Sequence, residues 1–264
     1  MTEESRFDTR VAHSARVRNY LLGGKDNFQV DRTVAEAMVT AIPGLPRMVH
    51  ENRAFLRRAA RIMAEQLGIR QFLVLGTDLP TSLNLHEIVQ AIEHSTRVVY
   101  VDNDPFVLAV ARALLTSHPQ GHCAYVDADL RDPRTILADP ALTGVLDLSR
   151  PVGVTLTSVL TLVADEDDPW GKVAELRDAM PSGSCVAITH PSADFDPEPV
   201  NQAVAVARGA GMTLVPRTRE QVAGFLGDWV LLAPGLVPAA AWRPDPGAFE
   251  PADAVCWAGV ACKP

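Results

Sequence analysis

The chain has 264 residues, a formal net charge of −8 and a sequence pI of about 5.3. This length suits one large domain, or one domain with a cap, and 47 % hydrophobic against 21 % charged residues allows a sizeable core. An acidic chain lacks the broad basic surface that displaces counterions from phosphates, which argues against non-specific binding to nucleic acid. The start shows no secretory signal, and no window reaches the ~18 apolar residues of a spanning helix, so we expect a soluble, cytoplasmic protein without a membrane partner.

Four cysteines, at positions 123, 185, 256 and 262, bear on metal binding and redox chemistry. None forms a C-x-x-C pair, so we expect no structural zinc and no other metal site. Three of them lie inside apolar runs, where we expect buried thiols.

The first 69 residues show helical patterns at 12–22, 31–41 and 47–67 and no good strand. We interpret residues 1–69 as a helical cap packed on one edge of a sheet, with Pro43–Pro46 as the hinge before its third helix. The run from Arg53 to Met63 mixes arginines with apolar residues, which we interpret as a solvated helix face.

From Arg70 onward, short β-branched runs alternate with helical patterns. Such alternation requires crossover connections, so residues 70–264 are predicted to form one compact α/β unit with a mostly parallel, doubly wound sheet. A proline-rich stretch at 234–251 is expected to be an ordered surface loop, and Thr81 or Ser82 to cap the first helix. The expected strands are 71–76, 97–102, 122–129, 151–163, 184–190, 212–215 and 254–262, and the expected helices are 83–92, 105–115, 133–138, 170–180, 199–209 and 219–225.

The carboxyl ends of the first three strands carry the residues most suited to a ligand, because doubly wound sheets bind ligands there. Gly76 permits a close approach to the backbone after the first strand. Asp102, 26 positions later, can accept hydrogen bonds from the two hydroxyls of a ribose. Asp129 could accept from an adenine amino group, with Leu130 against the ring. Because G-x-G-x-x-G and the P-loop lysine are missing, the pattern favours an adenosine moiety over a pyrophosphate.

Six stretches resemble the actinobacterial S-adenosylmethionine-dependent methyltransferase family that was long catalogued as a domain of unknown function. The piece YLLGGKDNF, residues 20–28, is the most specific, since generic methyltransferase folds do not need it. The resemblance implies a Rossmann-like, class I methyltransferase sheet, the cofactor S-adenosyl-L-methionine and a small-molecule substrate. The matching stretches are residues 14–32, 51–59, 72–87, 98–115, 125–133 and 164–170.

The resemblance also implies a division of roles in the site. Gly76 and Thr77 would border the methionine part of the cofactor, and Ser158 would face the same slot. The other implied contacts are Asp102 and Asn103 with the ribose, Asp129 and Leu130 with the adenine, and Tyr20, Gly23, Gly24 and Lys25 over the methionine end, with Arg53 or Arg57 as a second carboxylate partner. Two alternatives stay open: Gly23 and Gly24 as a plain helix C-cap, and Tyr20 and Ser158 as packing residues.

Four positions depart from the family's pattern, which usually reads L-D-x-G-T-G-L-P-T in the first loop. Val74 replaces the strand acid and Asp78 replaces the second glycine. Asp78 would either repel the methionine carboxylate or bind the ammonium group that Val74 no longer serves, and we favour the second interpretation. Thr161 stands where a histidine is usual, and Arg18 where an aromatic residue is expected.

The candidates for a catalytic base are His190, Asp26 and Asp165 or Glu166. His190 could equally be a satisfied loop histidine, and the acidic run 165–168 is more simply a helix cap than a metal site. The expected function is methyl transfer to an apolar or aromatic metabolite; the alternatives are a degenerate cofactor-binding sensor and a non-methylating enzyme, such as a cyclase, on this scaffold. The sequence leaves the oligomeric state open, a homodimer included.

Overall fold

The strands of the computed structural model, which describes residues 8–245 and 255–264, form one eight-stranded sheet in the order β3-β2-β1-β4-β5-β8-β6, with β7 paired to β8 beside this path. Strands β1 to β5 are parallel neighbours, whereas β8 runs antiparallel between β5 and β6. The expected mostly parallel α/β sheet is therefore confirmed. The bounds are β1 (Gln71–Leu75), β2 (Arg97–Asp102), β3 (His122–Asp127), β4 (Gly153–Thr157), β5 (Cys185–Pro191), β6 (Val230–Leu231), β7 (Val237–Pro238) and β8 (Cys256–Cys262).

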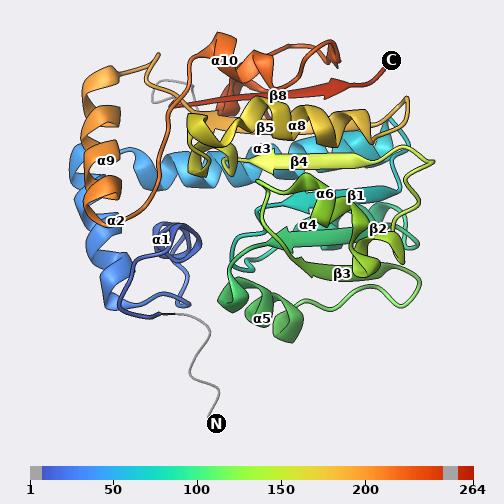
Figure 1. Ribbon diagram of the computed structural model, residues 1–264, viewed down its shortest axis with the longest axis horizontal. Helices are drawn as coiled ribbons and strands as arrows, with labels where there is room; N and C mark the ends of the chain where they lie inside the picture. Colours follow the sequence, from blue (N-terminus) through green and yellow to red (C-terminus); the bar gives the residue numbers. More distant parts are fainter. Residues whose placement is uncertain (1–7, 246–254) are drawn as a thin grey trace.

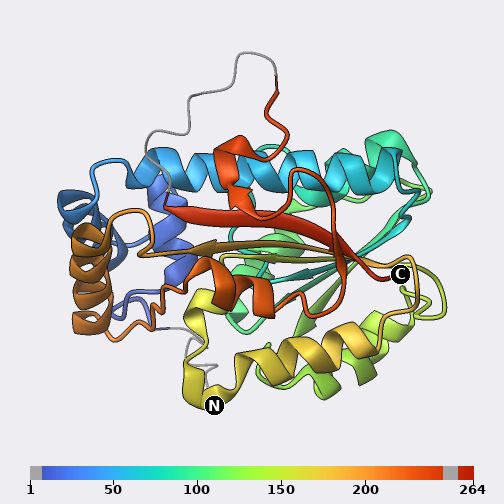
Figure 2. The same ribbon diagram turned by 90° about the horizontal axis from the view of Figure 1, so that it is seen from above.

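Helices cover both faces of the sheet, as Figure 2 shows with the long α3 on one side and α8 on the other. The central strands are consequently buried on both faces and read as continuous apolar runs. Phe72 and Val74 point into the cluster beneath α3, whereas Leu73 and Leu75 belong to the opposite cluster. The helices of the two layers are α3 (Leu45–Glu65) and α4 (Leu85–Ile92) on one face, and α6 (Pro133–Ala138), α7 (Pro140–Thr143), α8 (Pro169–Asp178) and α10 (Arg219–Gly224) on the other. Helix α5 (Pro105–Leu114) packs against β2 and β3.

Three further helices lie together at the end of the sheet to which the β4 arrow points (Figure 1). They are α1 (Ser14–Leu21), α2 (Gln29–Ala41) and α9 (Pro197–Gly209), and they share an apolar cluster with the first turns of α3. A buried ion pair between Arg16 Nε and Asp31 Oδ2, 3.0 Å apart, joins α1 to α2. Because α3 contributes Val49 to this cluster and Phe55 to the sheet core, it belongs to both layers; the division into a 1–69 cap and a 70–264 domain stays a prediction.

Several predicted boundaries are wrong for local reasons. Helix α4 starts at Leu85 because Asn84 and Glu87 form its capping box, not Thr81 or Ser82. The apolar run 151–163 is no single strand: β4 ends at Thr157, Ser158 adopts a left-handed φ of 55°, and a 3₁₀ turn follows at Leu160–Leu162. Residues 212–215 form no strand; among the described residues, their backbone bond to a distant segment is that from Val215 N to Thr161 O.

The arginine-rich stretch of α3 is not the solvated face that its charge suggested. Arg58 is buried and donates from Nε to Trp242 O (2.9 Å) and from Nη2 to Ala239 O (2.8 Å), while Arg53 is buried toward Thr81. Within the proline-rich stretch the fully buried Trp242 confirms an ordered segment as far as residue 245; residues 246–251 lie outside the described part.

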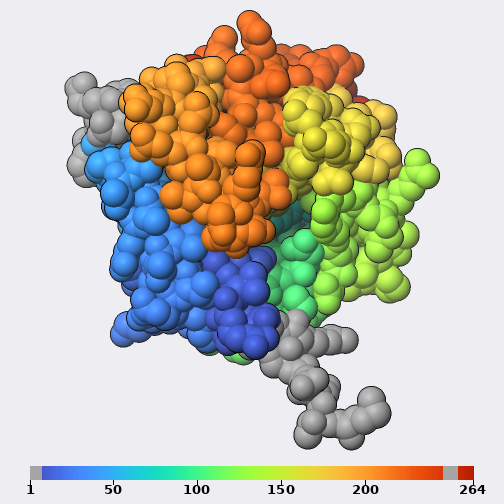
Figure 3. Space-filling view, turned by 60° about the vertical axis from the view of Figure 1, so that its left-hand side comes forward, coloured from blue at the N-terminus to red at the C-terminus, as the bar shows by residue number. Residues whose placement is uncertain are grey.

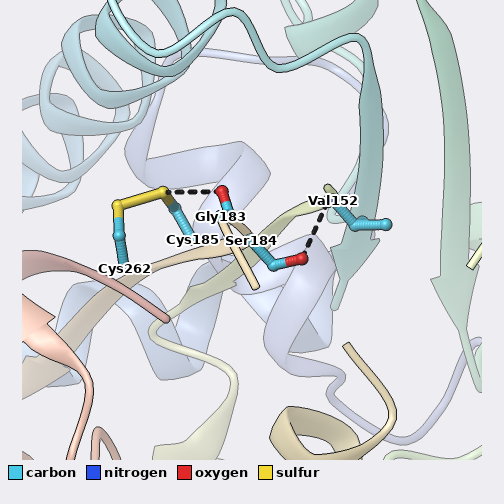
Figure 4. The surroundings of a disulfide bond; sticks show 5 residues. All are labelled: Val152, Gly183, Ser184, Cys185 and Cys262. Atoms are coloured by element: carbon cyan, nitrogen blue, oxygen red, sulfur yellow. Dashed lines mark hydrogen bonds between the residues drawn. A yellow bond between two sulfur atoms is a disulfide. The ribbon is translucent and has the colours of Figure 1, made fainter. Parts of the chain in front are cut away.

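Two of the four cysteines form a disulfide, which corrects the expectation of buried thiols. Cys185 on β5 and Cys262 on β8 are direct partners in the antiparallel ladder, with Cα atoms 4.0 Å apart (Figure 4). Their separation of 77 residues hid this pairing from the sequence. Cys123 and Cys256 are free, and burial raises the pKa of the Cys256 thiol to about 12. Across residues 8–245 and 255–264, none of the helices combines the length and apolarity needed to cross a bilayer.

Candidate active site

A cavity of about 490 Å³ lies at the carboxyl ends of the parallel strands, beneath α1 and the segment after α9. Figure 3 looks onto this end, where α1 in dark blue, α9 in orange, the segment after β4 in yellow and that after β3 in green meet around a hollow. The volume falls within the ~300–1,000 Å³ common for small-molecule sites. The floor consists of Leu75, Gly76, Asp78, Val101, Asp102, Asn103, Ala128, Asp129, Leu130, Arg131, Thr157, Ser158 and Val159, and the walls include Val11, His13, Val17, Arg18, Leu21, Met38, Leu45, Met48, Val49, Asn52, Thr161, Leu162, Met212, Leu214 and Cys256.

Asp102 is the buried carboxylate of this floor. Its Oδ2 accepts from Thr77 N (2.9 Å) and its Oδ1 accepts from Asp104 N (3.0 Å), which locks the side chain at the tip of β2. Burial raises the pKa of Asp102 to about 6, with Asp78 adding to the effect and the two backbone donors opposing it. An ionised carboxylate offers about four acceptor sites, so two remain for a ligand in the cavity.

The loop after β1 lines the cavity at Gly76, where the backbone packs tightly against the Val159 side chain. Gly76 has φ 75°, and a Cβ atom there would lie 2.5 Å from Cγ2 of Val159. Thr77, which follows, does not line the cavity: its N–H holds Asp102 and its hydroxyl donates to Val101 O (3.2 Å). Thr77 therefore positions the carboxylate and does not itself face the space.

Asp129 and its neighbours form the part of the floor beyond β3. Asp129 accepts four hydrogen bonds: three from Arg131 (N, Nε and Nη2) and one from Asn103 Nδ2 (2.8 Å). These bonds, led by the Arg131 side chain, lower the pKa of Asp129 to about 2. All its acceptor sites are thus in use, and a hydrogen bond to an adenine amino group requires Arg131 or Asn103 to move. Leu130 lines the cavity as a buried apolar side chain.

Ser158 lines the cavity and continues into a buried hydroxyl chain. Its Oγ lies 3.2 Å from Oγ1 of Thr189, which donates to Oδ1 of Asn52 on α3. The bond assigns Oδ1 of Asn52 as the acceptor, and Asn52 itself lines the cavity. Sequence reasoning missed Asn52, although it lies in the matching stretch 51–59, next to Arg53.

Two of the departures from the family pattern meet at the cavity. Arg18 Nη2 on α1 lies 3.1 Å from Asp78 Oδ2 in the loop after β1, and both residues line the space. Asp78 has φ 57°, the left-handed conformation in which glycine is unstrained and aspartate tolerated. Thr161, the third departure, also lines the cavity, with its hydroxyl donating to Val215 O (3.0 Å).

In the turn at residues 20–27, Leu21 lines the cavity, but Tyr20, Gly23, Gly24 and Lys25 do not. Tyr20 donates from its hydroxyl to Glu36 Oε1 (2.9 Å), and Lys25 is exposed. The N–H groups of Gly23 and Gly24 bond to Tyr20 O and Asn19 O and so close the C-terminus of α1, as the capping alternative predicts. Tyr20, Gly23, Gly24 and Lys25 therefore do not lie at the cavity that the strand-tip residues line.

The candidate bases lie outside the cavity lining as well. Asp26 follows the α1 turn, where its N–H donates to Asn19 Oδ1. Asp165 pairs with Arg217 Nη2 at 2.6 Å, and Asp168 caps α8 through Gly171 N, which agrees with the cap interpretation of the acidic run. Within the described ranges, no three His, Cys, Asp or Glu side chains gather as a metal site would require.

His190 is fully buried beneath the sheet edge and is held in one tautomer. Its Nδ1 donates to Pro191 O (2.8 Å), and its Nε2 faces Nη1 of Arg217 at 3.1 Å. Burial lowers the pKa of His190 to about 4, and the Arg217 charge acts in the same direction. His190 is consequently a neutral structural histidine, which is the alternative that the sequence left open.

Because the pKa of His190 is depressed, folding stability should depend on pH. The neutral ring contributes fully above the unfolded pKa of 6.5, and this contribution is lost as pH falls from 6.5 through about 4. The shift corresponds to roughly 3 kcal/mol at most. Chemical denaturation at pH 7.5, 6, 5 and 4.5 should therefore show a steeper loss of unfolding free energy in the wild type than in His190→Gln. Parallel curves for the two proteins would contradict the assignment.

Comparisons with known proteins show the family to which the chain belongs. A family profile described as S-adenosyl methyltransferase matches residues 1–264. The chain is 41 % identical to a DUF574 family protein from Streptomyces avermitilis, with 98 % of this chain and 100 % of that chain covered and a TM-score of 0.95. It is 37 % identical to a proposed methyltransferase from Thermobifida fusca, with 97 % and 96 % covered and a TM-score of 0.87. No match was found among curated proteins.

More distant structures share the fold alone. Human N-acetylserotonin methyltransferase, solved with S-adenosylmethionine, is 12 % identical, with 94 % of this chain and 70 % of that chain covered and a TM-score of 0.50. The strand order, with one antiparallel strand between β5 and β6, is that of the class I methyltransferase sheet, so the expected Rossmann-like fold is confirmed. The match over all 264 residues and the two relatives above 30 % identity show that the chain belongs to the S-adenosyl methyltransferase family.

Proposed function

We propose that the chain transfers a methyl group from S-adenosylmethionine to a small apolar or aromatic molecule, with the cofactor in the cavity at the strand tips. The observation that carries the proposal is Asp102: a buried carboxylate, locked by two backbone donors, with two acceptor sites left toward the cavity. Two hydroxyls on adjacent ribose carbons match such a carboxylate. Asp129, by contrast, already uses all its acceptor sites. The proposal therefore rests on the ribose contact and not on the adenine contact.

The residues around Asp102 fit the remaining parts of the cofactor. Gly76 lets a ligand approach the backbone after β1, and Leu130 offers an apolar surface beyond β3. Ser158 borders the space between them from β4. When bound, the cofactor supplies an electrophilic methyl group on a sulfonium sulfur. The protein's part is to hold an acceptor in line with the sulfur–methyl bond, which requires placement more than proton transfer.

The upper part of the cavity determines which acceptor would fit. Its wall is largely apolar, formed by side chains from α2, the start of α3 and the segment after α9, namely Met38, Leu45, Met48, Val49, Met212 and Leu214. Methionine side chains adapt to irregular apolar shapes. A small apolar or aromatic acceptor is therefore favoured over a charged or polymeric one.

Calorimetric titration with S-adenosylmethionine and S-adenosylhomocysteine tests the binding step. We expect a micromolar dissociation constant, about −8 kcal/mol. Incubation with methyl-labelled S-adenosylmethionine and a panel of phenols, indoles and heteroaromatic amines then tests transfer, with S-adenosylhomocysteine formation as the readout. No binding at millimolar cofactor would refute the proposal.

A second candidate is a cofactor-binding protein without turnover. It is favoured by one observation: His190, Asp26 and Asp165, the candidate bases, lie outside the cavity lining. Acceptors that need deprotonation would then depend on His13, which lines the cavity with its Nδ1 3.0 Å from Asp104 Oδ2. Binding of the cofactor without methyl transfer to any acceptor, including thiols and amines that are already nucleophilic, would support this candidate.

A further inference from the structure

The Arg18–Asp78 pair is the feature of the cavity that the general fold does not explain. Arg18 projects from α1 and Asp78 from the loop after β1, 60 residues later in the chain, and their side chains are only 17 % and 16 % exposed. Both stand at positions where the resemblance leads to other residues, an aromatic and a glycine. Because the two exchanged residues contact each other, they are best understood as one coupled change.

The charges around the pair favour an additional anion. Arg53 is buried on α3 and lies near both members; burial lowers its pKa, whereas Asp78 raises it and Arg18 and Arg57 lower it further. The three guanidinium groups of Arg18, Arg53 and Arg57 thus lie close enough to act on one another, with the Asp78 carboxylate among them. Nε of Arg18 and Nε of Arg57 are buried with no hydrogen-bond partner among the residues that the structure describes. Buried guanidinium groups with unused donors are costly unless an anion accepts from them.

The pair lies where the amino-acid end of the cofactor would extend. This step rests on the proposed function: with the ribose at Asp102, the methionine part runs toward Gly76 and the loop that carries Asp78. That end of the cofactor is a zwitterion, with an α-ammonium and an α-carboxylate group. A planar guanidinium fork matches a carboxylate, and a carboxylate matches an ammonium group.

We propose that Arg18 and Asp78 together recognise the zwitterionic end of the cofactor, Arg18 through its carboxylate and Asp78 through its ammonium group. Asp78 then binds the ammonium group in place of the strand acid, whose position Val74 occupies. Arg18 offsets the charge of Asp78 in the free protein. In the complex, Arg18 binds the carboxylate of the cofactor.

Titrations with three ligands separate the two contacts. S-adenosylhomocysteine carries both charges, decarboxylated S-adenosylmethionine lacks the carboxylate, and 5′-methylthioadenosine lacks the whole amino-acid end. Arg18→Met should weaken S-adenosylhomocysteine at least 30-fold and the other two less than threefold. Asp78→Asn, which keeps a residue that tolerates positive φ, should weaken the first two ligands about tenfold and leave methylthioadenosine unchanged. Arg61→Met, on the exposed part of α3, is the matched control and should change none of them.

The outcomes separate this inference from the proposed function. If all three ligands bind and Arg18→Met weakens them equally or not at all, the charge recognition is wrong while the cofactor site stands. If Arg18→Met or Asp78→Gly strengthens S-adenosylhomocysteine, the pair obstructs the site and the inference is overturned. If the wild type binds none of the three, the proposed function fails and the inference with it.

Discussion

The Asp102→Asn variant is expected to bind S-adenosylhomocysteine roughly 100-fold more weakly than the wild type, since charge-assisted hydrogen bonds contribute about 1.5–3 kcal/mol each. Each carboxylate oxygen already accepts one backbone N–H, from Thr77 and from Asp104. An amide nitrogen in place of either oxygen would face one of these donors, so the side chain must turn. Calorimetric titration at pH 7.5, where the carboxylate is ionised, measures the loss.

Asp127→Asn is the matched control for this variant. Asp127 is the register partner of Asp102 on β3 and also ends its strand, but it is exposed and does not line the cavity. The control should bind S-adenosylhomocysteine as the wild type does. Because the Asp102 change alters backbone hydrogen bonds, its thermal midpoint is measured alongside. A folded Asp102→Asn protein with wild-type affinity would place the ribose elsewhere and remove the basis of the proposed function.

The strand-tip acids could be found from the sequence because their positions follow from local pattern. A run of β-branched residues defines β2, and the residue that ends it must lie at the carboxyl edge of a parallel sheet. This position after the run predicts Asp102 at that edge, and it lines the cavity there; its contact with a ribose stays a prediction. The same pattern predicts Asp129 at this edge, and it lines the cavity. The pattern does not predict the hydrogen bonds of Asp129, because these depend on the side chains of Arg131 and Asn103.

Contacts between distant segments could not be predicted in this way. Arg18 and Asp78 each stood out as an exchange, yet nothing in the chain indicated that α1 brings one onto the other. The Cys185–Cys262 disulfide depends on the register of β5 and β8, which is a tertiary property. Ser158 ends a run that reads as one strand, because its backbone is left-handed even though its N–H still donates to Thr189 O.

The same limit explains why the prediction of a solvated arginine face on helix α3 was wrong. Its arginines follow one another at helical spacing, and a charged helix face is usually solvated. Arg58 is buried because residues 239 and 242, far along the chain, present two carbonyl groups to it. A buried arginine is recognisable only when its acceptors are known.

Arg217→Met is expected to destabilise the fold by about 3 kcal/mol, because each buried acceptor left without a partner costs about 1–3 kcal/mol. Arg217 is 1 % exposed and donates to Leu160 O and Val163 O, each at 2.8 Å, and to Asp165. Methionine fills much of the space of the side chain but removes the Arg217 donors from Val163 O and from Leu160 O, which keeps only its bond from Val163 N (3.2 Å). For a domain of this size the loss corresponds to a fall of roughly 6–12 °C in the thermal midpoint.

Asp165→Asn separates the buried carbonyl contacts from the ion pair. The Asp165 side chain is 55 % exposed, so its pairing with Arg217 is screened by water and contributes less than about 1 kcal/mol. If Asp165→Asn destabilised the protein as much as Arg217→Met, the ion pair and not the carbonyl contacts would hold the turn at 160–163. That turn carries Thr161 and Leu162 into the cavity wall. Arg217→Met should therefore also weaken cofactor binding at temperatures well below its thermal midpoint, although Arg217 does not line the cavity, whereas Asp165→Asn should not.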